Sequence, residues 1–238
     1  MKLSIIVPAY NEEKYIIVSL KNLKHNLEKV FSDYEIIVVN DGSTDNTLNL
    51  LNQNPNLYKK LFNHDKNRGK GEAVKTALRE CSGEYIIFHD ADLEYEAKNI
   101  WDLYDLVMNG NFSLVLGHRM EGYEINRNID YFHYYIGVKV LTIIINILYG
   151  SQISDSATCF KLIDGNLARS IDFYSKGFAL DFEIICKVLR LGHSISECPV
   201  NYKQRSRKEG KKIKAVDGFI ALIVIILERF NLSHIISK

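Results

Sequence analysis

Short apolar runs alternate with amphipathic segments along the first half of this 238-residue chain. The runs lie at residues 3–7, 34–39, 60–63, 86–88 and 113–116. Most of them are dominated by consecutive apolar residues, and the run at 3–7 is mainly aliphatic, which is typical of strands buried on both faces; the run at 60–63 is weaker. Strand and helix patterns alternate at least four times, and such alternation favours parallel pairing. The sequence therefore predicts an α/β fold, with a mostly parallel sheet flanked by helices in a Rossmann-like arrangement.

A cluster of polar residues follows each of the five runs. The clusters lie at residues 8–12, 41–45, 65–70, 90–94 and 117–119. In open α/β sheets, ligands bind beyond the carboxyl ends of the strands. We therefore expect one site assembled from five loops.

The fourth cluster carries three carboxylates, Asp90, Asp92 and Glu94. Residues two apart in an extended segment point to the same side, so the two aspartates can converge on one ligand. Hard oxygen donors of this kind suit Mg²⁺ or Mn²⁺ held between the protein and a diphosphate. An isolated Asp-x-Asp is more often an ordinary solvated turn, so the other clusters carry the interpretation.

Three residues of the other clusters have side chains suited to a nucleotide. Asp41 is placed to accept hydrogen bonds from a ribose or a base edge, and it could equally be a helix-capping residue. Lys70 lies between two glycines, which allow close approach to a phosphate, and Arg119 is a candidate bidentate phosphate clamp. The first strand is not followed by G-x-G-x-x-G and the chain has no Walker lysine loop, which argues against a dinucleotide site or a P-loop.

Composition sets a few further limits. The net charge of +1 argues against a global nucleic-acid binder. The four cysteines show neither CxxC pairing nor zinc spacing, so we expect buried, reduced thiols. The first residues enter a strand directly, without signal-peptide architecture. We expect a single domain over residues 1–238 in the cytoplasm.

The second half carries two apolar segments and a basic cluster. The segments cover residues 131–149 and 218–227, and neither spans a bilayer. Seven basic residues and one acidic residue lie between positions 203 and 214. Core helices and a solvated loop are the simpler explanations, and nucleic acid would require an aromatic platform. We expect both segments to form membrane-surface helices beside a basic cluster that suits an anionic surface or a lipid phosphate.

Four motifs in order resemble the family 2 glycosyltransferases: Val-Pro-Ala-Tyr-Asn-Glu at 7–12, Val-Asn-Asp-Gly-Ser-Thr-Asp-Asn-Thr at 39–47, Asn-Arg-Gly-Lys-Gly at 67–71 and Asp-Ala-Asp at 90–92. Within that family the chain is most similar to the dolichyl- or polyprenyl-phosphate mannosyl- and glucosyltransferases. The likeness continues through residues 159–161 and 197–200. It implies a GT-A fold, a nucleotide-diphosphate-sugar donor, a divalent metal and inversion at the anomeric carbon.

The resemblance also implies roles for individual residues. Those expected to bind the donor are Pro8, Tyr10 and Glu12 around the nucleobase, Asp41 on the nucleoside, Asp65 and Lys70 beside the base and diphosphate, and Asp90 on the sugar or ribose. Asp92 and Glu94 would hold Mg²⁺ or Mn²⁺. Many relatives carry glutamine where Glu94 stands.

A phosphate acceptor fits the basic residues of the second half. A phosphate monoester has a second pKa of about 6 and is largely dianionic at neutral pH, so it needs charge screening rather than a general base. The predicted clamp consists of Arg119, Arg127 and Arg205. Asp155, Asp181 and Glu183 are candidate bases or partners that orient these arginines, and we favour the second role.

The resemblance implies an inverting hexosyltransferase that uses GDP-mannose or UDP-glucose and a polyprenyl or dolichyl phosphate, and the basic residues of the second half fit such an acceptor. Residues 1–119 would bind the donor, and residues 120–238 would bind the acceptor. The enzyme would lie on the cytoplasmic face of a membrane, with a membrane-anchoring subunit as a possible partner. A saccharide acceptor and a nucleotide-sugar-binding scaffold are the alternatives.

Overall fold

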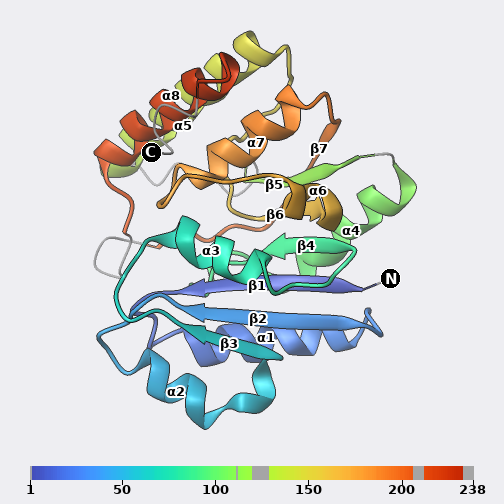
Figure 1. Cartoon of the computed structure of the whole chain (residues 1–238), viewed down its shortest axis with the longest axis vertical. Coiled ribbons are helices and arrows are strands. Elements are labelled where there is room, and N and C mark those ends of the chain that lie inside the picture. The colour runs from blue at the N-terminus through green and yellow to red at the C-terminus, as the bar shows by residue number, and fades with distance from the viewer. Residues whose placement is uncertain (1, 111, 120–128, 206–211, 233–238) are drawn as a thin grey trace.

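A seven-stranded mixed sheet forms the centre of the molecule, with helices on both faces (Figure 1). The computed structural model describes residues 2–110, 112–119, 129–205 and 212–232. The strand order is β3-β2-β1-β4-β6-β5-β7. All strands run parallel except β6, which is antiparallel to both neighbours. The strands are β1 (Leu3–Ala9), β2 (Tyr34–Asn40), β3 (Lys60–Asn63), β4 (Tyr85–Phe88), β5 (Leu114–His118), β6 (Lys161–Asp164) and β7 (Ile195–Pro199).

Two hydrophobic clusters lie on opposite faces of this sheet, because successive strand residues point to opposite sides. Ile6 faces one cluster, while Ile5 and Val7 face the other. The first cluster is covered by α3 (Lys70–Leu78), α5 (Ile129–Tyr149), α6 (Gly165–Ser170), α7 (Leu180–Arg190) and α8 (Ala215–Arg229). The second is covered by α1 (Ile16–Glu28), α2 (Thr47–Gln53) and α4 (Ile100–Asn109). Three-residue 3₁₀ helices precede β3 and α4.

The structure confirms the predicted mostly parallel sheet with helices on both faces. Each of the five apolar runs overlaps a strand of the structure, and each strand ends within two residues of the expected position. The antiparallel β6 and the helix α7 were not predicted. All four cysteines lie in the described part of the chain, where they are buried and form no disulfide.

Helices α5 and α8 lie side by side at the outer edge of the molecule (Figure 1). The Tyr134 hydroxyl donates to the Ile213 carbonyl, and the Tyr149 hydroxyl donates to the Ile225 carbonyl, so the two helices run in the same direction. Their inner residues join the core, and their outer residues are apolar and exposed. No helix in the described ranges combines the length and hydropathy needed to cross a membrane.

Candidate functional site

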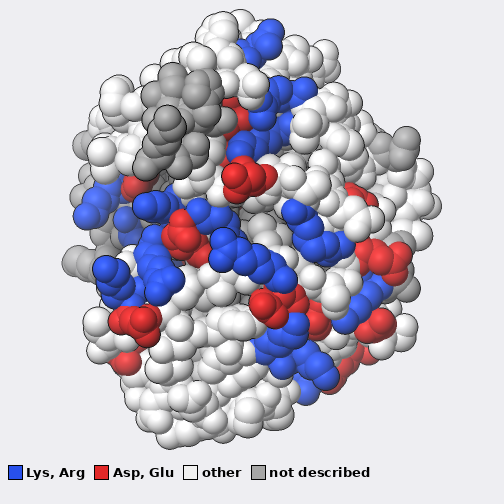
Figure 2. Space-filling model, viewed as in Figure 1, with Lys and Arg blue, Asp and Glu red and all other residues white. Residues whose placement is uncertain are grey.

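A cleft of about 850 Å³ lies at the carboxyl ends of β1, β2 and β4. On the side of the view where β1–β4 end, basic and acidic side chains are intermixed at the surface (Figures 1 and 2). Loops from both halves of the chain line the cleft. The lining residues that are charged, or that were expected to contact the nucleobase, are Pro8, Tyr10, Glu12, Asp41, Lys70, Asp90, Asp92, Glu94, Arg205, Lys212, Lys214 and Asp217.

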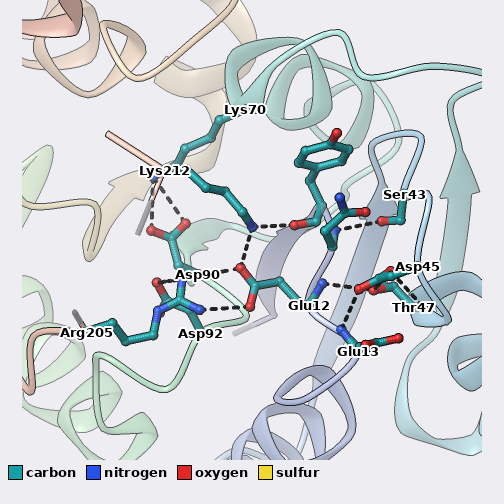
Figure 3. Close-up of polar contacts among 12 residues, drawn as sticks. Glu12, Glu13, Ser43, Asp45, Thr47, Lys70, Asp90, Asp92, Arg205 and Lys212 are labelled. Atoms are coloured by element: carbon teal, nitrogen blue, oxygen red, sulfur yellow. Dashed lines mark hydrogen bonds and ion pairs between the residues drawn. The ribbon is translucent and has the colours of Figure 1, made fainter. Parts of the chain in front are cut away.

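The loop after β1 is held in place by side chains of the loop after β2 (Figure 3). The backbone N–H groups of residues 11–13 donate in order to Ser43 Oγ at 3.0 Å, Thr47 Oγ1 at 2.9 Å and Asp45 Oδ2 at 3.1 Å. Asn11 has a φ of 50°, a left-handed conformation that asparagine tolerates better than most residues. These three bonds fix the buried Glu12 against the floor of the cleft.

Asp41 organises the next loop as well as reaching the cleft. Its Oδ1 accepts from His64 Nδ1 at 2.7 Å and from the Arg68 N–H at 2.9 Å, and its Oδ2 accepts from the Gly69 N–H at 2.8 Å. The second ring nitrogen of His64 is 2.9 Å from Thr76 Oγ1. Asp41 is therefore not a helix cap. It shapes the turn that carries Lys70, and its role toward a nucleoside stays a prediction.

The two glycines beside Lys70 are required by close packing against residues 175–177. A Cβ on Gly69 would lie 2.3 Å from the Lys176 carbonyl oxygen, and one on Gly71 would lie 2.0 Å from the Ser175 carbonyl oxygen. Gly69 also has a φ of 96°, which favours glycine. This backbone contact places the start of α3, and Lys70 with it, at the cleft.

Lys70 belongs to a quartet of two lysines and two aspartates, of which Lys161 and Asp181 are buried and Lys70 and Asp90 are partly buried. Its Nζ is 3.1 Å from Asp90 Oδ1 and 3.2 Å from Asp181 Oδ2, and Lys161 Nζ is 2.8 Å from Asp181 Oδ1. Burial alone would lower the pKa of Lys70, but Asp181 and Asp90 raise it well above its usual value. Burial would raise the pKa of Asp90, and Lys70 reverses this shift. These shifts favour the charged forms of Lys70 and Asp90, and the quartet combines two basic with two acidic side chains.

Arg205 lies among the carboxylates on the other side of the cleft (Figure 3). Its Nη2 is 2.8 Å from Asp92 Oδ2, and its Nη1 is 3.0 Å from Glu12 Oε2. Burial raises the pKa of Asp92 to about 7, the charges of Asp90 and Glu94 add to this shift, and Arg205 opposes it. Burial would lower the pKa of Arg205, but Asp92 and Glu12 raise it. This part of the cleft therefore has an excess of negative charge that favours a cation.

Glu94 joins the loop after β4 to the segment that carries Arg205. Its Oε2 accepts from the Tyr202 hydroxyl at 2.8 Å, and its Oε1 accepts from the Arg205 N–H at 2.7 Å. The Lys203 N–H donates to the Glu94 carbonyl at 2.8 Å, and Tyr95 forms a β-bridge with Tyr202. These contacts bring the acidic loop and the basic segment together, although they are far apart in the sequence.

The acidic residues of this cleft fit a divalent ion shared with a diphosphate. In the residues that the structure describes, no group of three or more His, Cys, Asp or Glu side chains converges as a complete cation cage. Mg²⁺, however, is usually held by one or two carboxylates together with substrate phosphates. Asp92 and Glu94 already share one cation, the Arg205 guanidinium, at 2.8 and 3.9 Å. The two residues predicted to hold the metal are thus near each other.

Two of the predicted residues, Arg119 and Asp65, lie outside this lining, and a third is not among the residues that the structure describes. The Arg119 guanidinium makes a buried bidentate pair with Asp155, with Nε–Oδ2 at 2.6 Å and Nη2–Oδ1 at 2.7 Å. Asp65 has a side chain that is 95% exposed and is 3.9 Å from Arg68. Arg127 lies outside the described residues, as do Arg207, Lys208 and Lys211 of the basic cluster. The expectation that the loop after β5 lines the cleft with the other four is therefore wrong for Arg119.

The prediction that three acids orient arginines holds for one of them. Asp155 orients Arg119 as expected. Asp181 contacts two lysines, and Glu183 accepts from the Tyr174 and Ser175 N–H groups and pairs with Lys187 at 2.8 Å. Among the described residues, the basic groups that contact Asp181 and Glu183 are lysines rather than the predicted arginines.

Two lysines of the site have roles that the sequence did not reveal. Lys212 Nζ is 2.6 Å from Glu12 Oε1 and also donates to the Tyr10 carbonyl, so it lies directly over the loop after β1. The sequence indicated Lys212 only as one member of a basic cluster. Lys161 is fully buried in β6, and no sequence pattern indicated it.

Comparison with known proteins gave consistent results. The family model described as Glycosyl transferase family 2 matches residues 4–179. A dolichyl-phosphate beta-glucosyltransferase ALG5A from Trichomonas vaginalis is 32% identical and aligns with 92% of this chain and 70% of its own length. The low-salt glycan biosynthesis hexosyltransferase Agl6 of Haloferax volcanii is 28% identical over 85% of this chain and 48% of its own length.

Solved structures with the same fold include glucosyl-3-phosphoglycerate synthase from Mycobacterium tuberculosis. One of its structures superposes with a TM-score of 0.73 at 18% identity and covers 97% of this chain and 81% of that one. Another, in complex with Mn²⁺, UDP and glucosyl-3-phosphoglycerate, superposes with a TM-score of 0.70. At this identity the likeness concerns the fold alone, and it confirms the expected GT-A architecture.

Proposed function

We propose that this chain, which belongs to glycosyl transferase family 2, transfers a hexose from a nucleotide-diphosphate sugar to a polyprenyl phosphate. The observation that carries the proposal is the single cleft that contains both the carboxylates Asp92 and Glu94 and the cations Lys70 and Arg205. Carboxylates there suit a metal-bound diphosphate, and the cations suit phosphate oxygens.

The names of the relatives support a phosphate-bearing lipid as the acceptor. Two curated relatives are dolichyl-phosphate beta-glucosyltransferases. The chain spans 48%, 70% and 66% of the lengths of the three relatives compared. Their names therefore support the acceptor class of this chain as a proposal, and not every activity of the longer proteins. Of the two donors that the sequence leaves open, the glucosyltransferase names of these relatives favour UDP-glucose over GDP-mannose.

In this proposal the donor lies across the loops after β1, β2 and β4. Pro8, Tyr10 and Glu12 would contact the base, and Asp41 would face the nucleoside. Lys70 would pair with the diphosphate while Asp90 faces the sugar. Asp92 and Glu94 would hold Mg²⁺ or Mn²⁺, and a divalent ion bound there neutralises charge on the departing diphosphate.

The acceptor phosphate then needs positioning rather than proton removal. An oxygen of the dianionic phosphate attacks the anomeric carbon from the face opposite the diphosphate. The new carbon–oxygen bond forms as the bond to the diphosphate breaks, which inverts the configuration. Arg205 and Lys212 are the described cations of the cleft best placed to hold this phosphate. The acids weighed as bases, Asp155, Asp181 and Glu183, are all paired with cations, which supports a reaction without a general base.

Incubation with radiolabelled UDP-glucose or GDP-mannose, Mn²⁺ and polyprenyl phosphate tests this function. We expect the label of UDP-glucose to appear in the lipid fraction and to be released from the lipid by mild acid. Label in a saccharide instead would favour the alternative acceptor. Stabilisation by nucleotide sugars in a thermal-shift assay, without transfer to either acceptor, would favour a binding scaffold.

A peripheral position on the membrane is part of the proposal. The outer faces of α5 and α8 together form an exposed apolar surface, which consists of Ile136, Val140, Ile143, Ile147, Val216, Phe219, Ile220 and Ile226. On α5 these residues recur at intervals of four, three and four, which places them on one face. Both helices begin at the cleft, where Tyr134, Lys214 and Ala215 are among the lining residues. A lipid phosphate in the cleft would thus have its chain near this surface.

Charged substitutions on this surface should weaken membrane binding. Ile147 is 75% exposed and Phe219 is 64% exposed. Burying either side chain in lipid contributes about 1.5–3 kcal/mol, so Ile147→Glu or Phe219→Glu should each lower the affinity for anionic vesicles by about tenfold or more. Cosedimentation measures this effect. Val18→Glu on α1 changes a similarly exposed residue elsewhere and should have little effect. Equal losses in all three variants would contradict the assignment of this face.

A further inference from the structure

Arg205 occupies the negative part of the donor site. Its Nη1 and Nη2 lie 3.0 and 3.3 Å from the two Glu12 oxygens, and Nη2 is also 2.8 Å from Asp92 Oδ2. Its Nε is 3.9 Å from Glu94 Oε1. The side chain is 12% exposed, and its guanidinium carbon lies 5.4 Å from the centre of the Tyr15 ring. The carboxylates assigned to the metal (Asp92 and Glu94) and to the nucleobase (Glu12) are thus engaged by the Arg205 guanidinium.

This arrangement is not needed to attach the segment to the body of the protein. The Tyr202 hydroxyl and the Arg205 N–H both bond to the Glu94 carboxylate, and the Lys203 N–H bonds to the Glu94 carbonyl. These three contacts hold residues 202–205 without the guanidinium. Lys212 also remains at Glu12 if Arg205 leaves it. The guanidinium can therefore move away while its backbone stays in place.

We propose that a divalent cation and the Arg205 guanidinium exchange at Asp92 and Glu94, so that metal binding releases Arg205 to bind the acceptor phosphate. This inference rests on the proposed function, and it adds an order of events to it. A cation that bonds Asp92 Oδ2 takes the oxygen that Arg205 now uses, and the two positive charges repel each other at that distance. The displaced guanidinium is then the nearest fork-shaped donor for a phosphate.

The exchange makes donor and acceptor binding cooperative. In the absence of metal, the Arg205 guanidinium is engaged by Glu12 and Asp92, so it does not bind the acceptor phosphate. With metal bound, Arg205 is released, so each ligand strengthens the other by the same factor. A phosphate acceptor is thereby bound more tightly when a metal-bound donor is present, which disfavours unproductive acceptor complexes.

Mn²⁺ titrations followed by electron paramagnetic resonance test the exchange without any turnover. Arg205→Ala should bind Mn²⁺ about tenfold more tightly than the wild type, within the range of roughly 5–150-fold typical of coupled sites. Arg205→Lys keeps the positive charge but loses the planar guanidinium that bonds two carboxylates at once. The Mn²⁺ affinity of this variant should fall between those of the wild type and Arg205→Ala. The matched control is Lys203→Ala, which removes one positive charge from the same segment, where the Lys203 side chain is exposed. Its affinity should stay within about twofold of the wild type, because solvent screens exposed charges.

A second titration measures the coupling to the acceptor, with farnesyl phosphate as a soluble probe. In the wild type and in Lys203→Ala, Mn²⁺ with UDP should strengthen farnesyl phosphate binding by about tenfold, the factor by which Arg205 weakens Mn²⁺. In Arg205→Ala this gain should be lost.

Either of two results would overturn the exchange: an Arg205→Ala variant that binds Mn²⁺ no more tightly than the wild type, or a Lys203→Ala variant that tightens equally. Absence of hexosyl transfer by a wild type that shows the Mn²⁺ effect would instead count against the proposed function alone.

Discussion

Replacing Asp92 with alanine is expected to lower hexosyl transfer by about 10³-fold. Its carboxylate Oδ2 is 2.8 Å from Nη2 of Arg205, and the residue lines the cleft beside Asp90 and Glu94. Loss of one preorganised electrostatic group at a leaving group typically costs about 10²–10³-fold, and loss of a metal ligand removes the charge of the ion as well. Initial rates with radiolabelled UDP-glucose and polyprenyl phosphate measure the effect.

The fold should survive this change. Asp92 is buried, and its pKa is raised first by that burial and then by the charges of Asp90 and Glu94. The ionised carboxylate is therefore disfavoured in the folded protein, so its removal should leave Tm within about 2 °C of the wild type, which is less than about 1 kcal/mol. Asp105→Ala, in an exposed aspartate on α4, serves as the control and should keep full activity. Full turnover by Asp92→Ala would refute its assignment to the metal.

The part of the site that could be predicted from the sequence is the part that depends on strand ends. Asp41, Lys70 and Asp92 each follow a strand or begin the helix after one, and parallel strands bring such positions to one edge of the sheet. Those three residues do line one cleft. For these residues a local sequence pattern is enough to predict the site, because the parallel strand order brings the ends of distant strands together.

Arg119 shows where that reasoning fails. It follows β5 as expected, but β5 is separated from β4 by the antiparallel β6, and Asp155 lies close enough to form a buried bidentate pair. The two partners are 36 positions apart in the sequence. Asp155 was expected to orient an arginine, but no sequence pattern indicates that this pair lies outside the cleft. Pairing between distant charged residues depends on packing of the second half, which the sequence alone does not reveal.

Strand β6 was missed for a related reason. It has four residues, Lys161–Asp164, with a charged residue at each end and two aliphatic residues between them. A lysine in a strand normally indicates an exposed face, yet Lys161 is fully buried and pairs with Asp181 on α7. Lys161, which made the strand hard to predict, pairs with Asp181, and Asp181 in turn contacts Lys70.

Replacing Lys161 with methionine is expected to destabilise the protein by about 3–5 kcal/mol, because removing one partner of a buried pair leaves an uncompensated charge. Lys161 Nζ is 2.8 Å from Asp181 Oδ1 and also donates to the Thr158 carbonyl. Without it, Asp181 and Asp90 share the single ammonium of Lys70. Asp181→Asn should cost a similar amount, because Lys161 then keeps only the carbonyl of Thr158. Urea denaturation of both variants measures these losses.

The double variant separates charge balance from packing. Lys161→Met with Asp181→Asn leaves Lys70 and Asp90 as a neutral pair, so at least about half of the loss in either single variant should be recovered, since replacing both members of a buried pair is often close to neutral. The surface pair Lys24–Glu28, with charged atoms 3.8 Å apart on α1, serves as the control in a second double-mutant cycle. That surface pair should show a coupling of about 0.5 kcal/mol or less. Additive losses at Lys161 and Asp181 would contradict the quartet, because independent residues would not share their cost.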